Sequence, residues 1–80
     1  MDKSDALKTF SALSQETRLD ILRLLIKSGC DGMLSGELSE KLSVRQNTLS
    51  ANLTILLNAG LVRNERTGRT IRYYTNFASL

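Results

Sequence analysis

The 80-residue chain is long enough for one small domain, and its 41% hydrophobic and 24% charged residues are typical of a globular protein. A domain this short has a thin core, so we expect it to gain stability by association with a second copy. The sequence contains no histidine, which argues against most enzyme classes because the usual general base and the commonest nitrogen ligand of zinc are missing. The net charge of +3 is unevenly placed. Residues 1–44 hold six basic and seven acidic side chains, whereas residues 45–80 hold five basic side chains and one acidic side chain.

Two helices are predicted in the first third of the chain. The first spans residues 3–13, where apolar side chains recur at three- and four-residue spacing: Ala6, Leu7, Phe10 and Leu13. Ser14 is a favourable N-cap for a second helix that ends near Ser28, because its hydroxyl can accept a hydrogen bond from a free backbone N–H group. Apolar residues cover more than one side of this second helix, so we expect it to lie at the centre of the core.

Two shorter helices follow a break at residues 29–32, where a glycine stands at each end. A third helix is predicted over residues 35–42, beginning at a serine that can cap it. After a three-residue connection, a fourth helix is predicted over residues 46–58, and Gly60 ends it. Two helices joined by such a tight turn form a helix-turn-helix unit.

The hydrophobic period changes to two after Gly60. Residues 61–66 and 69–75 are predicted as strands with a turn at Thr67-Gly68 between them. The predicted fold is therefore mostly α with a small β-hairpin: a single winged helix-turn-helix domain over residues 1–80, with four helices followed by a two-stranded wing.

The two sides of the predicted fourth helix differ in chemistry. Leucines line one side, and the opposite side carries mostly polar, uncharged residues at three- and four-residue spacing: Gln46, Asn47, Ser50, Ala51, Thr54 and Asn58. Solvent-facing helices usually carry lysine and glutamate, whereas amides and hydroxyls hydrogen-bond base edges and phosphates. The pattern favours contact with nucleic acid; a polar helix face without a partner is the alternative.

Charge supports the same interpretation. Residues 41–64 contain no carboxylate, and all five basic residues beyond position 44 are arginines, whose planar guanidinium suits phosphate oxygens and guanine edges. Arg66 and Arg69 flank the tip of the predicted hairpin. Such a surface can approach a polyanion without repulsion, although charge alone fits a solvated face equally well.

Cys30 is the single cysteine, so the chain has no internal disulfide, as is usual in a reducing compartment. The longest apolar run, residues 55–57, is far shorter than the roughly 20 residues that a membrane span needs, and no signal peptide opens the chain. We therefore expect a cytoplasmic protein without a membrane partner, in which Cys30 is a small passive residue near a turn.

Three linked segments carry a family resemblance: FSALSQETRLDILRLL, LSVRQNTLSANLTILLNAGLV and RTGRTIRYY. In this order they are similar to the opening pair of helices, the recognition helix and the wing of the ArsR-type bacterial repressors, the arsenical-resistance and metal-sensing family. The resemblance covers residues 10–74, about four fifths of the chain. The linked order of the segments is far more specific than any one of them.

The resemblance implies a homodimeric transcriptional repressor that binds double-stranded operator DNA and leaves it when an inducer binds. Its recognition helix and wing map onto a DNA-binding set of ten residues: Arg45, Gln46, Asn47, Thr48, Ser50, Ala51, Asn52, Thr54, Arg66 and Arg69. Family members often carry serine at the position of Arg45 and an arginine-histidine pair at Ala51-Asn52. We therefore expect a different operator, and a phosphate contact by Arg45.

No cofactor or metal site is expected. The family's cysteine-containing sensing motif falls on Met33–Gly36, which has no thiolate, and the chain is expected to lack the C-terminal helix that holds the other metal site. That helix also supplies much of the family's dimer interface, which leaves Leu7 and Phe10 as the candidate dimer contacts. The inducer is not identified. Arsenite or another thiophilic ion sensed outside this chain, a redox signal, or no inducer that acts on this chain are all compatible with the resemblance.

Two other functions stay open. A winged helix can serve as a protein-protein interaction module in which the fourth helix meets another protein, and salt-dependent duplex binding would distinguish the two roles. An enzyme with Cys30 as its nucleophile would need a base near the glycine turn, which histidine cannot supply here.

Overall fold

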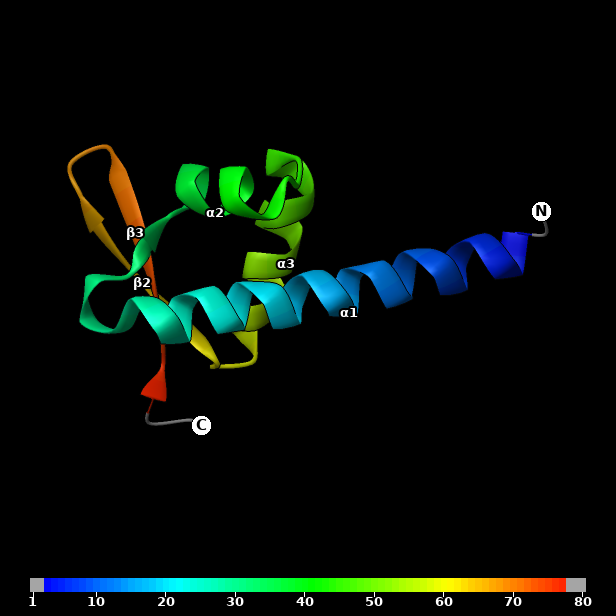
Figure 1. The fold of residues 1–80 in the computed structure, drawn as a ribbon, viewed down its shortest axis with the longest axis horizontal. Helices are drawn as coiled ribbons and strands as arrows, with labels where there is room; N and C mark the ends of the chain where they lie inside the picture. The colour runs from blue at the N-terminus through cyan, green and yellow to red at the C-terminus, as the bar shows by residue number, and fades with distance from the viewer. Residues whose placement is uncertain (1–2, 78–80) are drawn as a thin grey trace.

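In the computed structural model, the backbone is described for residues 3–77 and the side chains for residues 15–77. Over this range the chain forms three α-helices, a short 3₁₀ turn and three strands (Figure 1). The helices are α1 (Lys3–Ser28), α2 (Ser35–Leu42) and α3 (Gln46–Asn58), and the 3₁₀ turn η1 covers Gly29–Asp31. The strands are β1 (Met33–Leu34), β2 (Val62–Thr67) and β3 (Thr70–Thr75).

Helix α1 is continuous where the sequence predicts two helices. The predicted boundary at Ser14 is wrong, because the helix runs without interruption from residue 3 to residue 28. No glycine or proline falls in this stretch, and the polar residues that follow Leu13 each cost a helix interior less than about 0.7 kcal/mol. The described fold therefore has three helices instead of four. Within the described residues, no helix combines the length and apolar content that crossing a bilayer requires.

The strands form one antiparallel sheet in the order β1-β3-β2. Met33 of β1 lies opposite Tyr73, and the β2–β3 pairing runs from Val62 opposite Thr75 to Thr67 opposite Thr70. The hairpin is present as predicted, with each strand starting one residue later. Strand β1 is not predicted from the sequence, because two residues are too few to show a period of two.

Gly32 connects η1 to β1 and meets a close neighbour. Its φ of 63° lies in the left-handed region, and a Cβ atom built there would come within 2.6 Å of the Tyr73 carbonyl oxygen and of the Tyr74 ring. Only glycine lets the backbone pass so close to β3 in this conformation. Gly32 thus permits the third strand to join the wing.

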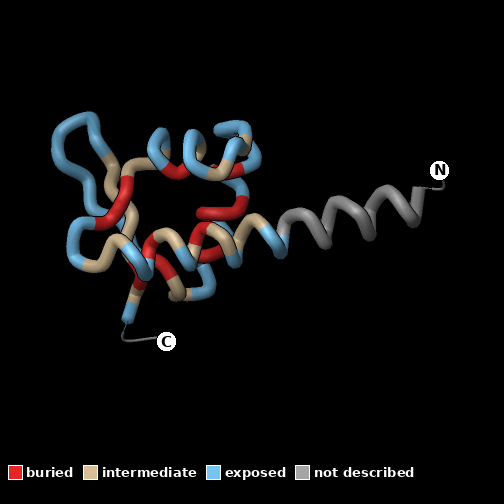
Figure 2. The backbone as a smooth tube through the Cα atoms, in the orientation of Figure 1, coloured by how far each residue is buried: buried red, intermediate tan, exposed pale blue. Residues whose placement is uncertain are grey.

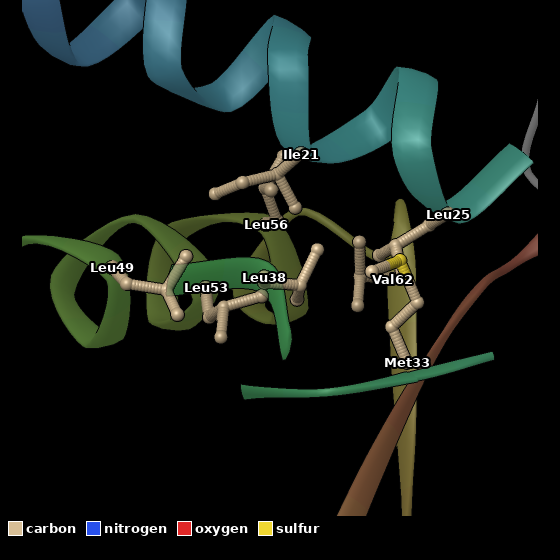
Figure 3. Packing of buried hydrophobic residues seen from close by; sticks show 8 residues of the cluster. All are labelled: Ile21, Leu25, Met33, Leu38, Leu49, Leu53, Leu56 and Val62. Carbon is tan, nitrogen blue, oxygen red and sulfur yellow. The ribbon is translucent and has the colours of Figure 1, made fainter. Parts of the chain in front are cut away.

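The core is built by all three helices with one residue from each of two strands (Figure 2). Its fully or nearly fully buried members are Ile21, Leu25, Met33, Leu38, Leu49, Leu53, Leu56 and Val62. Figure 3 shows the side chains of α1 reaching toward the leucines of α2 and α3, with Met33 and Val62 closing the side toward the sheet. The expected central position of the second half of α1 agrees with the complete burial of Ile21 and Leu25.

The turn between α2 and α3 depends on Ser43. This residue adopts a left-handed conformation with φ of 53°, and its N–H group donates to the Glu40 carbonyl at 3.3 Å. The N–H of Val44 donates to the Ser39 carbonyl at 3.1 Å, while the Ser39 hydroxyl donates to the Val44 carbonyl. These bonds satisfy the last carbonyl groups of α2 and fix the direction in which α3 leaves the turn.

Candidate nucleic-acid interface

The orientation of α3 follows from its buried stripe. Leu49, Leu53 and Leu56 point into the core, so the opposite side of the helix faces outward. The outward positions are exposed and carry no charge: Gln46, Asn47, Thr48, Ser50, Ala51, Thr54, Ile55 and Asn58. An extended surface of amides and hydroxyls is therefore available along the whole length of α3.

Two side chains on this surface already make hydrogen bonds within the helix. The Asn47 side-chain oxygen accepts from the N–H of Thr48 at 2.8 Å, which leaves its amide nitrogen without a partner among the described residues. The Thr54 hydroxyl donates to the Ser50 carbonyl at 2.9 Å. Asn47 thus presents donors outward, whereas the hydroxyl proton of Thr54 is used inside the helix.

The N-terminus of α3 is open and lacks acidic residues. Arg45 occupies the N-cap position with extended backbone, and its exposed side chain makes no capping hydrogen bond to the helix. The free N–H groups of a helix N-terminus and its dipole attract anions. Arg45 and the first turn of α3 therefore form an electropositive corner that suits a phosphate group.

Asn52 differs from the other predicted contacts. Its exposure is only 2%, so the expectation that it faces a ligand is wrong. Position 52 lies between Leu49 and Leu53 on the buried stripe, and its amide contacts Arg18 of α1. Asn52 joined the expected DNA-binding set through the family resemblance, whereas the spacing of the polar face omits position 52. The buried stripe of α3 is wide enough to include it.

The wing exposes nearly all of β2 beyond its first residue. Because successive side chains of a strand alternate between faces, Arg63 and Glu65 share one face while Arg66 lies on the other, opposite Ile71. Figure 1 shows the hairpin tip rising on the side of α1 that also carries α2 and α3. Arg69 stands in the turn at that tip and is exposed.

Two of the wing arginines already contact other residues of the domain. Arg63 lies 2.7 Å from the Glu65 carboxylate, and its guanidinium stands 4.3 Å from the centre of the Tyr74 ring. Arg72 donates to the Asp31 carbonyl at 3.3 Å and lies 3.9 Å from the Glu37 carboxylate. The contacts of Arg72 attach the wing to η1 and α2, whereas those of Arg63 lie within the hairpin itself.

The remaining arginines of the second half are Arg45, Arg66 and Arg69. All three are exposed, and none forms an ion pair with any residue whose side chain is described. Glu65, the single carboxylate beyond position 44, is already paired with Arg63. The exposed arginines of the second half that have no ion-pair partner among the described side chains therefore lie at the start of α3 and in the wing.

The candidate dimer contacts cannot be placed. The side chains of Leu7 and Phe10 lie outside the described residues. On the described turns of α1, Leu19 is 55% exposed and Ile26 is 48% exposed. Leu19 also lines a shallow, largely apolar groove together with Leu22, Leu56 and Leu61. Part of α1 thus presents aliphatic side chains to its surroundings.

No group of three or more potential metal ligands is found among the side chains that the structure describes. Cys30 is exposed and in the free thiol form, in the 3₁₀ turn η1.

The chain is similar in sequence to known helix-turn-helix proteins. Residues 13–65 match the helix-turn-helix domain family. The chain is also 37% identical over 81 aligned positions to an uncharacterised HTH-type transcriptional regulator of Bacillus subtilis, YbzH, with 86% of this chain and 81% of that protein covered.

Solved structures show the same fold. Reduced HlyU from Vibrio cholerae superposes with a TM-score of 0.68 at 32% identity, covering 90% of this chain and 73% of that one. A second similar structure is the homodimeric winged helix-turn-helix DNA-binding domain of Mb0332 from Mycobacterium bovis, described as a possible ArsR-family transcriptional regulator. It superposes with a TM-score of 0.66 at 27% identity, covering 95% of this chain and 72% of that one. The sequence match and the fold agree in assigning a family of regulators instead of enzymes. The chain therefore belongs to the helix-turn-helix family of transcriptional regulators, in its ArsR-like winged form.

Proposed function

We propose that residues 1–80 form one sequence-specific DNA-binding unit of a transcriptional repressor. Helix α3 enters the major groove, where Gln46, Asn47 and Ser50 read base edges. Thr48, Ala51 and Thr54 line the same contact surface. The observation that carries this proposal is the exposed, uncharged polar face of α3 in a stretch of chain without carboxylates.

The chemistry of this face suits a base pair. The major groove of B-form DNA admits an α-helix, and each base pair presents there its own pattern of donors and acceptors. Amide side chains can donate and accept at once, and the free amide nitrogen of Asn47 offers donors to purine N7 or O6 acceptors. Hydroxyls such as that of Ser50 adapt to either partner.

The three unpaired arginines supply the backbone contacts. Arg45 reaches a phosphate beside the N-terminus of α3, while Arg66 and Arg69 of the wing contact neighbouring phosphates or the minor groove. Such contacts fix the position of a protein on the duplex without reading its sequence. Each neutralised phosphate releases counterions, so binding depends on salt.

Titration of a labelled duplex at several salt concentrations tests the proposal. Three phosphate contacts per copy predict that log K falls with log salt with a slope of about −3 per copy bound. Absence of duplex binding at low salt would reject the proposal and favour a module that binds another protein through the same face of α3.

The proposal includes a homodimer. The Mb0332 domain is described as homodimeric, and the exposed Leu19 and Ile26 offer this chain an apolar contact on α1. Two copies related by a twofold axis would read half-sites about 34 Å apart, one turn of the double helix. Leu7 and Phe10 stay predicted contacts of the same interface.

Repression and its relief by arsenite or another thiophilic inducer complete the proposal. This part rests on the ArsR-like family alone. The test is release of a bound duplex by arsenite, with Cys30→Ser as the control for the one thiol of the chain. If arsenite leaves the complex intact at concentrations that saturate dithiols, arsenite is not the inducer of this chain.

A further inference from the structure

A hydrogen-bond relay joins α1 to α3 through the interior. The Arg18 Nη1 atom donates to the Asn52 Oδ1 atom at 3.2 Å, and the Asn52 Nδ2 atom donates to the Thr48 carbonyl at 2.9 Å. Asn52 is 2% exposed and Arg18 is half-buried. The relay thus connects two helices whose residues stand 34 positions apart in the sequence.

The chemistry of the partners gives the relay one direction. A guanidinium can only donate hydrogen bonds and a backbone carbonyl can only accept them. The amide oxygen of Asn52 must therefore face Arg18 and its nitrogen must face Thr48, since the flipped amide would set donor against donor at one end. This orientation depends on chemistry and needs no assumption about which amide atom is which.

The relay holds the part of α3 that faces DNA in the proposed function. Thr48 stands next to Asn47 and two positions before Ser50. The leucines beneath α3 make apolar contacts, which have no preferred direction and permit small rotations of a helix. The Arg18–Asn52 hydrogen bond is directional and crosses from α1 to α3, so it restricts rotation of α3 about its axis. The Asn52–Thr48 bond lies within α3 and fixes the orientation of the amide that receives it. Contacts of this kind hold functional groups to within about 0.5 Å.

We propose that Arg18 and Asn52 are positioning residues that set the base preference of α3 without touching DNA. The inference rests on the proposed DNA-binding function and deepens it. It gives Asn52 a role in the interior in place of the base contact expected from the sequence, and it assigns to Arg18 a role distinct from the phosphate contacts of the other arginines.

The test uses apolar substitutions of similar size, Arg18→Met and Asn52→Leu, alone and together. Each single variant leaves a buried polar partner without its hydrogen bond, which costs stability. The double variant removes both partners, so its stability should return toward that of the wild-type chain. Arg23→Met is the matched control, because Arg23 lies on the same helix, is largely exposed and pairs only with Asp20 among the described residues.

The readout is discrimination between two duplexes. One is selected by the wild-type chain from a random-sequence pool, and the other differs from it at one base pair within the major-groove contact. The ratio of their dissociation constants should fall about tenfold in Arg18→Met and in the double variant, although the double variant has regained stability. The ratio should not change in Arg23→Met. The slope of log K against log salt should be the same for Arg18→Met and Arg23→Met.

Three results would overturn the inference. The first is a double variant that discriminates as the wild-type chain does. The second is a salt slope reduced by about 0.9 in Arg18→Met alone, which would make Arg18 a phosphate contact. The third result applies if the double variant does not fold. The inference is then overturned if Arg18→Lys, which keeps the charge and a hydrogen-bond donor, loses as much discrimination as Arg18→Met. A wild-type chain that selects no duplex would instead reject the proposed function itself.

Discussion

The arginines of this domain have unequal roles although the sequence presents them alike. Arg63 and Arg72 lie beside Glu65 and Glu37, and a salt bridge of this exposed kind contributes at most about 1 kcal/mol to stability. Arg45 and Arg66 have no such partner among the described side chains. This difference identifies the arginines that are available to phosphates.

Substitutions of Asn47 and Arg66 are predicted to have different effects on DNA binding. Replacing Asn47 by alanine removes donors aimed at base edges, so preference should change at one or two base pairs, by about 1–3 kcal/mol. Arg66→Ala should weaken binding to all duplexes alike and reduce the salt slope by about 0.9. Competition titrations against a set of single-base-pair variants measure both effects. Equal losses of affinity without any change of preference would contradict the separation of base-reading from phosphate-binding roles.

Gly32 is predicted to be irreplaceable by alanine. Gly32→Ala adds a Cβ atom 2.6 Å from backbone and ring atoms at a positive φ, so the free energy of unfolding should fall by about 2–3 kcal/mol or more. Gly36→Ala is the matched control: it lies in α2 with nothing within 4 Å of the added atom and should stabilise by up to about 1 kcal/mol. Urea unfolding of both variants measures the contrast, and equal effects would show that the contact at β3 does not limit this position.

The secondary elements show which parts of the fold are predictable from the sequence and why. Helix α3, its buried leucines and the hairpin follow from periodicity, which reports the burial of one face. The division of α1 at Ser14 was wrong because a good capping residue is also tolerated inside a helix when the flanking turns continue. Strand β1 owes its existence to pairing with Tyr73 and Arg72, nearly 40 residues away, which no local pattern records.

The candidate site was predictable to the extent that it depends on exposure. The outward residues of α3 were found from spacing, whereas the burial of Asn52 required knowledge of how α1 crosses α3. The engagement of Arg63 and Arg72 likewise depends on tertiary contacts with Tyr74, Asp31 and Glu37. Charge counting could not distinguish these arginines from those at the wing tip.

The connection between α2 and α3 carries a local strain that substitution should relieve. Ser43 adopts the left-handed conformation that glycine takes at little cost. Ser43→Gly should therefore raise the free energy of unfolding by about 0.5–1 kcal/mol, and base preference should not change because Ser43 contributes its backbone N–H group to the turn. Urea unfolding measures the change in the free energy of unfolding, and the duplex competition assay measures base preference. A loss of stability would mean that the Ser43 side chain makes a contribution larger than the relief of strain.

At the scale of the whole domain, α1 exposes the aliphatic side chains of Leu19 and Ile26, which we call the α1 strip. A domain of only 80 residues with such a strip is predicted to associate with a second copy. Leu19 and Ile26 expose about half of their surface, and a domain of this size gains more from covering such side chains than a larger protein does. The melting temperature of the wild-type chain should therefore rise with protein concentration, because dimerisation favours the folded state by mass action.

Leu19→Glu should remove that concentration dependence and raise the dimer dissociation constant at least about a hundredfold, because a carboxylate would have to be buried between the copies. Ile55→Glu is the matched control, with 49% exposure but on α3, away from the α1 strip. Sedimentation equilibrium of the wild-type chain, Leu19→Glu and Ile55→Glu shows whether the dimer interface lies on α1 or on α3. If Ile55→Glu dissociates the dimer and Leu19→Glu does not, the interface lies on α3, and the surface that we assign to DNA would instead be occupied by the second copy.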